Sequence, residues 1–329
     1  MSVTLSSKFQ GCLLGGAIGD SLGMPTEVGP SRKPGRTIAE TCGVGQVTTY
    51  LNSPNPDFLK AGEYTDDTQQ TICLAETFLD GNGNFSGIVF AEKLKGSIKK
   101  KMRGIGPSTK RIFEALSNGQ IQNVALGYMA SKYPTNGGTM RIAPVALLYY
   151  WDQKILFEKV VEATKITHGH PTSIAGACVH AFMIAKILTS QRETFDISSL
   201  RHEVASFIEP IDSEMAEHIE LSRKSSGNGC LVIETVPEVL DAFLNQPNDY
   251  LTGVLEQVNS DGDTDTKASM IGNLLGAWNG IQTIPQYLIN GLENGEKGKD
   301  YIVSLADRLL ELSDDLKLRT QPEQAGIED

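Results

Sequence analysis

The chain has 329 residues, of which 40% are hydrophobic and 21% charged, an ordinary globular composition with enough apolar residues for a large core. Its formal net charge of −11 argues against a nucleic-acid backbone or an anionic membrane as the main partner, because either would repel the average surface. The same charge is compatible with a site that collects cations.

Cysteine usage and the N-terminus bear on the cellular compartment. The five cysteines are odd in number, widely spaced and without a Cys-x-x-Cys pair, so neither a disulfide framework nor structural zinc is expected. The first ten residues lack a basic region followed by an apolar stretch, and no later run reaches about 18 consecutive apolar residues. We therefore expect a cytoplasmic protein.

Apolar residues recur at spacings of three and four through most of the chain, whereas alternating strand patterns are scarce. After a first helix at 11–23, this spacing predicts helices at 65–79, 108–117, 121–131, 139–151, 172–189, 213–223, 249–259, 265–280 and 299–315. Stretches rich in Pro, Gly and Asn predict loops at 29–57, 80–87 and 132–138. The expected fold is all-α, with one domain over 1–318 and a polar, flexible tail over 319–329.

The first predicted helix carries a glycine at every fourth position. These glycines form one nearly bare stripe: Gly11, Gly15, Gly19 and Gly23. Each costs about 1 kcal/mol relative to alanine in a helix, so the stripe needs a compensating benefit. Close packing against another helix is one such benefit. A central, buried helix that delivers Asp20 and Glu27 to an interior site is the other.

Two acidic clusters stand directly before predicted helices. The first is Thr65-Asp66-Asp67-Thr68, and a single acidic residue there would serve as an ordinary helix cap. The second runs from Asp261 to Thr266, with aspartates at alternating positions. It starts like a calcium loop, but Thr266 and Gly272 stand where an EF-hand needs Gly and Glu.

If the two clusters met, four carboxylates and several hydroxyls would surround a small volume. Carboxylates packed so closely repel one another unless cations neutralise them. Oxygen-only ligands select Mg²⁺, Mn²⁺ or Ca²⁺ over zinc or copper. The alternative is that both clusters are solvated helix caps.

Five short motifs in this order resemble the ADP-ribosylglycohydrolase family. They span about residues 10–280 and comprise Gly19–Glu27, Tyr64–Thr68, Asn136–Pro144, Thr167–His170 and Gly262–Thr266. The family includes the dinitrogenase reductase-activating glycohydrolase and hydrolases of ADP-ribosylarginine and ADP-ribosylserine. The resemblance implies an all-α domain with two Mg²⁺ or Mn²⁺ ions at the bottom of a cleft.

The resemblance also implies residue roles. The implied metal ligands are Thr65, Asp66, Asp67, Asp263, Asp265 and Thr266. Glu27 would sit beside the metals and handle water, Asp20 would be a supporting acid, and either Glu27 or Asp66 would activate the attacking water. The implied substrate-binding residues are Gly104, Gly106, Asn136, Gly137, Gly138, Thr139, Met140 and His168.

Some positions depart from the family pattern or stay open. The position before Asn136 is commonly glycine in the family but is Thr135 here, and Ala, Ser or Leu is more usual where this chain has Thr139. Both changes bear on the path of the phosphate-binding loop. Arg141 could contact phosphate or form an ion pair inside the helical bundle. The remaining histidines are expected to be structural.

The implied activity is release of ADP-ribose from a mono-ADP-ribosylated protein, with arginine as the favoured linkage and a monomer as the expected form. Three alternatives stay open. The chain could hydrolyse serine- or other O-linked ADP-ribose, it could act on phosphoesters or free ADP-ribose derivatives, or it could be a non-catalytic protein like the crystallins of this family.

Overall fold

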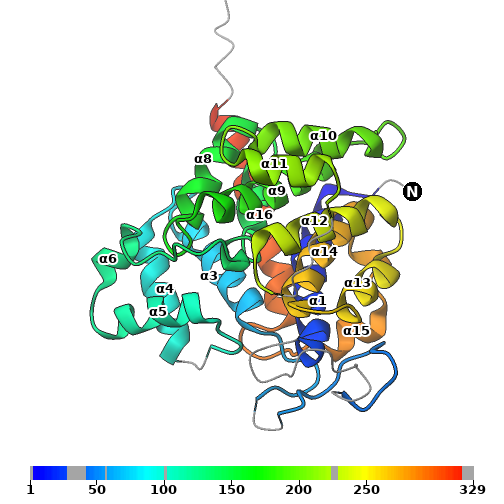
Figure 1. The fold of residues 1–329 in the computed structure, drawn as a ribbon, viewed down its shortest axis with the longest axis horizontal. Coiled ribbons are helices and arrows are strands. Elements are labelled where there is room, and N and C mark those ends of the chain that lie inside the picture. Colours follow the sequence, from blue (N-terminus) through cyan, green and yellow to red (C-terminus); the bar gives the residue numbers. More distant parts are fainter. Residues whose placement is uncertain (1–2, 28–41, 56–57, 100–101, 224–228, 321–329) are drawn as a thin grey trace, which may run out of the picture.

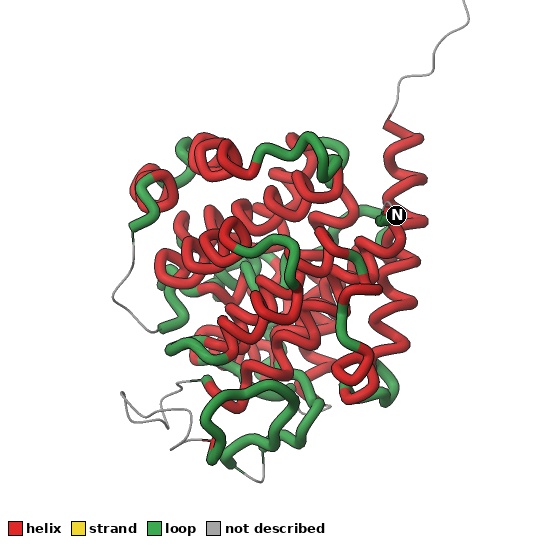
Figure 2. Tube along the Cα trace, turned by 90° about the vertical axis from the view of Figure 1, so that its right-hand side faces the viewer, coloured by secondary structure: helices red, strands yellow, loops and turns green. Residues whose placement is uncertain are grey.

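The computed structural model describes residues 3–27, 42–55, 58–99, 102–223 and 229–320. Within these ranges the chain forms α-helices, three short 3₁₀ helices and no strand, as the tube in Figure 2 shows. The predicted all-α fold is confirmed. Most of the predicted 29–57 loop lies outside the described residues.

The α-helices are α1 (Leu5–Gly23), α3 (Asp66–Asp80), α4 (Gly87–Lys99), α5 (Pro107–Ser117), α6 (Ile121–Ala125), α7 (Ala143–Tyr149), α8 (Gln153–Thr164), α9 (Pro171–Thr189), α10 (Ile197–Ile208), α11 (Ser213–Glu220), α12 (Val232–Asn245), α13 (Tyr250–Val258), α14 (Thr264–Asn279), α15 (Gln286–Gly291) and α16 (Lys299–Thr320). The 3₁₀ helices are η1 (Met24–Thr26), η2 (Asn136–Gly138) and η3 (Ile281–Thr283).

Two buried helices, α1 and α14, form the centre of the molecule. All 16 residues of α14 are buried, and a Cβ built on each stripe glycine of α1 would meet an α14 backbone oxygen. At Gly11 that oxygen belongs to Gly276, at 2.3 Å, and at Gly19 it belongs to Ala268, at 2.0 Å. The backbones therefore touch, and dispersion contacts along the seam offset the cost of glycine. The packing explanation of the stripe is confirmed.

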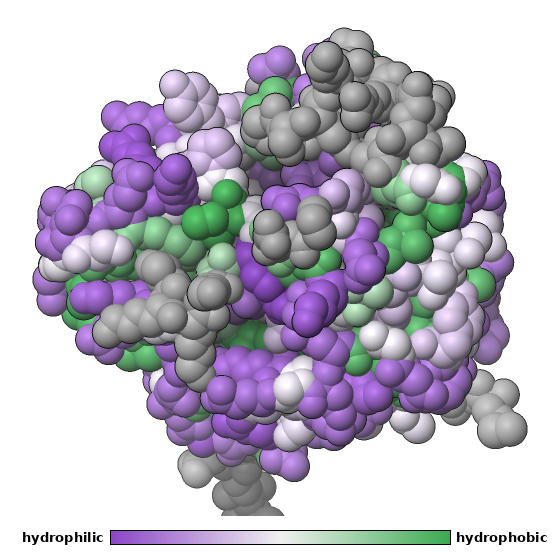
Figure 3. Space-filling view, turned by 90° about the horizontal axis from the view of Figure 1, so that it is seen from below, coloured by the Kyte–Doolittle hydropathy of each residue, from purple (hydrophilic) through white to green (hydrophobic). Residues whose placement is uncertain are grey.

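The other helices surround this pair. In Figure 1, α8 to α11 lie at the top, α4 to α6 on the left, and α12, α13 and α15 beside α14 on the right. The α1 helix runs down the middle, and its C-terminal end points toward the loops at the bottom. Figure 3 looks at that end, where hydrophilic residues dominate and hydrophobic residues form separate patches.

Helix α9 is apolar enough to raise the question of a membrane. By length and composition the helix could cross one, because an 18-residue stretch of it has a mean hydropathy of 1.5. However, 78% of that stretch is buried inside the molecule. It packs against α7, α8, α12 and α14. A helix buried by its own domain in this way is typical of the core of a globular protein.

Several helix boundaries differ from the predicted ones. The helix predicted at 121–131 ends at Ala125, because Gly127 adopts φ +75°, outside the helical region. The helix predicted at 139–151 begins only at Ala143, with Pro144 in its first turn, where the missing N–H costs nothing. Helices α4, α8, α10, α12 and α15 were not predicted.

The predicted tail boundary falls inside a helix. Arg319 and Thr320, the first two residues of the expected tail, complete the last turn of α16. The rest of that tail, 321–329, lies outside the described residues.

Candidate functional site

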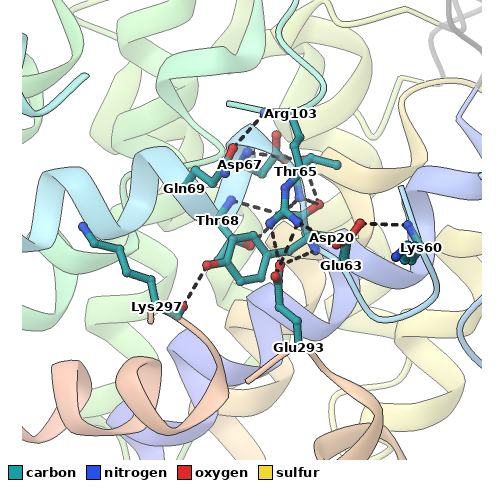
Figure 4. A network of polar contacts seen from close by, with 11 residues as sticks. Asp20, Lys60, Glu63, Thr65, Asp67, Thr68, Gln69, Arg103, Glu293 and Lys297 are labelled. Carbon is teal, nitrogen blue, oxygen red and sulfur yellow. Dashed lines mark hydrogen bonds and ion pairs between the residues drawn. The ribbon is translucent and has the colours of Figure 1, made fainter. Parts of the chain in front are cut away.

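Asp20, near the C-terminal end of α1, fixes the start of α3. Its side chain is fully buried and accepts four hydrogen bonds, from the backbone N–H and the hydroxyl of both Thr65 and Thr68, at 2.6 to 3.0 Å for the shortest contact of each group. Figure 4 shows this carboxylate reaching across from α1 to both threonines. Since its lone pairs are occupied, Asp20 acts as the expected supporting acid.

A second set of contacts holds the same helix start from the outside. The carbonyl of Arg103 accepts the Asp66 N–H at 2.7 Å, and the Arg103 N–H donates to Gln69 Oε1 at 2.9 Å. The Arg103 guanidinium pairs with Glu293, whose Oε1 also accepts the Tyr64 N–H at 3.1 Å. Figure 4 shows these groups converging on one turn. The segment carrying Gly104 is thereby tied to the acidic turn.

The carboxylates of Asp66 and Asp67 are both buried, being 4% and 3% exposed. Gln70 Nε2 donates to Asp66 Oδ2 at 2.6 Å, and the Thr266 hydroxyl donates to Asp67 Oδ2 at 3.0 Å. The second bond crosses from α14 to α3. The two acidic clusters, about 200 residues apart in sequence, therefore meet at one place.

The start of α14 brings a further acidic group together. One carboxylate oxygen each of Glu27, Asp263 and Asp265 lies within 4.8 Å of the others. Asn136 Nδ2 donates to Asp263 Oδ2 at 2.7 Å, so the glycine-rich turn joins the acidic group directly. Glu27 follows η1, as an extension of the central helix α1. The family resemblance implies water handling by Glu27 and metal binding by Asp263 and Asp265, and the structure places all three together.

Burial and mutual repulsion dominate the electrostatics here. Burial, with the neighbouring Asp20 charge, raises the pKa of Asp66 to about 7. Burial, with Asp20 and Asp66, raises the pKa of Asp67 well above its usual range. Burial, with Glu27 and Asp67, does the same to the pKa of Asp265. Among the described residues, none of the three carboxylates forms an ion pair with a Lys or Arg side chain.

The donor set fits hard divalent cations. The converging side chains offer carboxylate and hydroxyl oxygens. The acidic group found among the described residues consists of Glu27, Asp263 and Asp265, without a Cys or His. Oxygen ligands of this kind suit Mg²⁺, Mn²⁺ or Ca²⁺. A cation would also lower the raised pKa values by stabilising the charged carboxylates. The two predicted threonine ligands are both buried and both donate to an aspartate, Thr65 to Asp20 and Thr266 to Asp67.

The predicted substrate residues come from two loops beside the acidic group. A Cβ on Gly104, which has φ +80°, would lie 3.2 Å from Asp66 Oδ1, and Gly106 precedes α5. The turn of η2 carries Asn136, Gly137 and Gly138. The Met140 sulfur lies 3.9 Å from the Thr266 hydroxyl oxygen.

His168 packs edge-on against the η2 turn. A Cβ on Gly137 would lie 2.8 Å from its Nε2, so only glycine admits the ring at this distance. The ring is 1% exposed, and its Nδ1 is 2.8 Å from the Thr167 hydroxyl. Thr139 points elsewhere, since its buried hydroxyl faces Gly176 of α9 and has no hydrogen-bond partner among the described residues.

Arg141 does not form the ion pair that was one of its two predicted roles. It is 1% exposed, and its hydrogen bonds go to neutral Gln70 and Thr167 rather than to a carboxylate. Sequence reasoning missed Gln70, Arg103 and Glu293 altogether. Gln70 bonds to Arg141 71 positions away, and Arg103 bonds to Glu293 190 positions away, so no local pattern could have indicated these contacts.

A family model described as ADP-ribosylglycohydrolase matches residues 1–318. The chain belongs to the ADP-ribosylglycohydrolase family. The acidic cluster at the ends of α1, α3 and α14 is therefore the candidate active site of an ADP-ribosylglycohydrolase, in agreement with the resemblance seen in the motifs.

Named relatives within the ADP-ribosylglycohydrolase family differ in their described activity. An uncharacterized protein of Archaeoglobus fulgidus is 31% identical over 94% of this chain and 97% of its own. The ADP-ribosylhydrolase ARH3 of Gallus gallus is 25% identical over 85% of this chain and 87% of its own. The ADP-ribosylarginine hydrolase Tri1 of Pseudomonas putida is 26% identical over 84% and 72%.

A solved structure supports the fold. A chain of an ADP-ribosylglycohydrolase-related protein complex superposes with a TM-score of 0.73 over 94% of this chain and 99% of its own, at 23% identity. The all-α architecture is thus that of an ADP-ribosylglycohydrolase-related protein.

Proposed function

We propose that this ADP-ribosylglycohydrolase uses two Mg²⁺ or Mn²⁺ ions to release ADP-ribose from mono-ADP-ribosylated protein side chains, with arginine as the preferred linkage. The observation that carries the proposal is the meeting of two buried acidic helix starts, α3 and α14, beside the glycine-rich η2 turn. Buried carboxylates without a compensating charge are costly unless a ligand neutralises them.

In this proposal the protein's own residues divide the work. Asp66 and Asp67 on one side, and Asp263, Asp265 and Thr266 on the other, hold the cations. When bound, the cations supply positive charge to the ribose hydroxyls and to water. The Gly104 loop and the η2 turn bring backbone N–H groups close to the ribose and diphosphate, which glycine permits.

Cleavage at the anomeric carbon develops positive, oxocarbenium-like charge on the sugar, which the surrounding carboxylates stabilise. Glu27 is the best-placed group to take a proton from the attacking water. It is only partly buried, it lies within the acidic group, and it follows a short 3₁₀ turn rather than a rigid α-helix. Asp66, held by Gln70 and adjacent to Gly104, is the second candidate.

The arginine linkage rests on two supports. One similar relative, Tri1, is named as an ADP-ribosylarginine hydrolase. The net charge of −11 also favours a cationic leaving group, because a guanidinium is attracted to an acidic surface. A serine leaving group needs proton donation to its oxygen, and the sequence offers no additional acid motif for that step.

The test is a panel of matched peptides carrying ADP-ribose on arginine, serine or cysteine, assayed for initial rates at saturating Mg²⁺ or Mn²⁺. We expect the fastest release from arginine and loss of release in excess chelator, with recovery when metal is returned. A serine preference would overturn the linkage while leaving the metal-dependent hydrolase in place. Release that continues after complete metal removal would overturn the metal centre.

A further inference from the structure

The guanidinium of Arg141 is buried between the acidic group and His168. Arg141 is 1% exposed and has no carboxylate partner among the described residues. Its Nη1 donates to Gln70 Oε1 at 2.6 Å, its Nη2 donates to the Thr167 hydroxyl oxygen, and its carbon lies 5.0 Å from the Phe90 ring centre. Burying a cation without an ion-pair partner is costly, so the burial of this guanidinium needs a compensating benefit.

The first contact determines which way the Gln70 amide faces. An amide carries one accepting oxygen and one donating NH₂ group. Since Arg141 occupies the oxygen, the NH₂ group points the other way and donates to Asp66 Oδ2 at 2.6 Å. A flipped amide would place its oxygen against the Asp66 carboxylate oxygen. It would also place its NH₂ group against the donating N–H of Arg141. Arg141 therefore fixes the orientation of a predicted metal ligand through one intermediate residue.

The second contact determines the protonation site of the His168 ring. The Thr167 hydroxyl accepts from Arg141 and lies 2.8 Å from His168 Nδ1, with no other hydrogen-bond partner among the described residues. If Nδ1 carried the proton, the buried Thr167 hydroxyl would have no acceptor for its own hydrogen. The hydroxyl therefore donates to Nδ1, which leaves the ring proton on Nε2.

We propose that Arg141 is a positioning residue that sets both the Asp66 carboxylate and the His168 tautomer through two separate relays, by way of Gln70 and Thr167. The inference deepens the proposed function and rests on it for the roles of Asp66 and His168. Its consequence is that His168 presents an Nε2–H at the η2 turn, next to Gly137. That group suits an acceptor oxygen of ADP-ribose.

The His168 ring is a hydrogen-bond donor in this arrangement and not a source of protons for the reaction. Burial, with the nearby Arg141 charge, lowers the pKa of His168 to about 3, so the ring is neutral at physiological pH. Among the described residues the ring is hydrogen-bonded at Nδ1, so the Nε2–H stays able to donate to an acceptor oxygen.

Two relays predict two separable defects. Gln70→Leu is expected to weaken Mn²⁺ binding, titrated without ADP-ribose, by about 10- to 100-fold, as loss of a group that orients a metal ligand does. Its affinity for ADP-ribose at saturating Mn²⁺ should stay within about twofold. Thr167→Val should show the reverse, with ADP-ribose affinity reduced about tenfold, and Thr167→Ser should restore it.

Arg141→Met should produce both defects, because it releases both relays. Thr77→Val is the matched control. Thr77 is also a buried threonine, 1% exposed, and its hydroxyl donates to the Cys73 carbonyl within α3. It should change neither affinity. A folded Arg141→Met variant with normal Mn²⁺ and ADP-ribose affinities would overturn the proposal, as would the same pattern of defects in Gln70→Leu and Thr167→Val.

A direct measurement needs neither variants nor turnover. The ¹⁵N resonances of the His168 ring in the wild-type protein distinguish a protonated nitrogen from a bare one, and we expect the proton on Nε2. A proton on Nδ1 would overturn the Thr167 relay even if every activity assay succeeded. Conversely, a protein that releases no ADP-ribose from any peptide would contradict the proposed function, while the ring resonances and the Mn²⁺ titration would still decide the relays.

Discussion

The buried carboxylates at the site differ in how much of their hydrogen-bonding capacity other protein groups use. Asp20 is held by four hydrogen bonds from Thr65 and Thr68, whereas Asp265 receives a hydrogen bond from its neighbour's N–H and faces the other acids. A carboxylate whose hydrogen-bonding capacity is used serves the fold. A carboxylate with capacity left over serves a ligand.

Asp265→Asn tests the second role. Replacing one charged ligand by a neutral amide should reduce metal-dependent release of ADP-ribose by at least about 100-fold, because removing an essential charge stabiliser costs about that much. Circular dichroism should show an unchanged helical content. The readout is the initial rate on the arginine-linked peptide across a Mg²⁺ titration.

Asp196→Asn is the matched control for that variant. Asp265 lies in the first turn of α14, and Asp196 stands likewise at a helix start, as the N-cap of α10. Asp196 accepts from the Ser198 N–H at 2.9 Å and is exposed, and α10 lies at the top of Figure 1. Asparagine is an equally good cap, so activity and stability should both be unchanged. Equal losses in both variants would mean that aspartate at helix starts matters for folding alone.

At the scale of the helices, the contact between α1 and α14 determines where the site forms. The two backbones touch at glycines or small residues four positions apart, so sliding one helix along the other would lose the fit. In this register the end of α1 delivers Asp20 and Glu27 to the start of α14, where Asp263 and Asp265 stand. The glycine stripe is therefore also a device that aligns the site.

Gly11→Ala tests this packing away from the site. The added methyl would lie 2.3 Å from the Gly276 carbonyl oxygen, a backbone atom that cannot move alone. We expect a loss of about 2 kcal/mol in the free energy of unfolding, since overpacking a tight contact outweighs the gain in helix propensity. The measurement is the Tm in a calorimetric scan.

Gly96→Ala makes the same chemical change where there is room. Gly96 lies inside α4, and nothing is within 4 Å of the added methyl. The higher helix propensity of alanine should raise the stability by about 0.5 to 1 kcal/mol. Opposite signs for the two variants support close packing, whereas a stabilised Gly11→Ala would refute it.

Over the whole molecule, the site concentrates negative charge in a protein whose net charge is already −11. The folded pKa values of Asp66, Asp67 and Asp265 are raised above the ordinary value of about 4. In the absence of metal, Asp66 therefore binds a proton in the folded but not in the unfolded state between about pH 4 and pH 7, and the raised pKa values of Asp67 and Asp265 act in the same direction. This contribution to stability is lost as the pH rises.

Metal binding should reverse that loss, because cations bind the deprotonated carboxylates. We expect the rise in Tm on adding Mg²⁺ to be larger at pH 8 than at pH 5. The buried His168 and His180, whose pKa values are lowered to about 3 and about 4, affect the metal-free and metal-bound proteins alike and cancel in this difference. NaCl at matched ionic strength is the control. A Mg²⁺ effect that is equal or smaller at pH 8 would contradict the metal site.

The sequence predicted features that depend on neighbours along the chain. Helical spacing identified the all-α class, and helix-start chemistry identified Thr65–Asp67 and Asp263–Thr266, because periodicity and capping act over a few residues. The same local reasoning missed α12, since Pro237 lies inside it and proline ordinarily interrupts a helix. It also extended the helix at 121–131 past Gly127, whose φ only the fold determines.

Only the tertiary structure decided which of these features meet. The bond between Thr266 and Asp67 spans 199 positions, and it exists because α1 and α14 pack in one register that brings the start of α14 to the start of α3. Arg141 is buried as well, and its hydrogen-bond partners are Gln70 and Thr167 rather than a carboxylate. The sequence determines which chemical groups the protein carries. Their distances and burial depend on contacts between distant segments, and these two quantities determine what each side chain does.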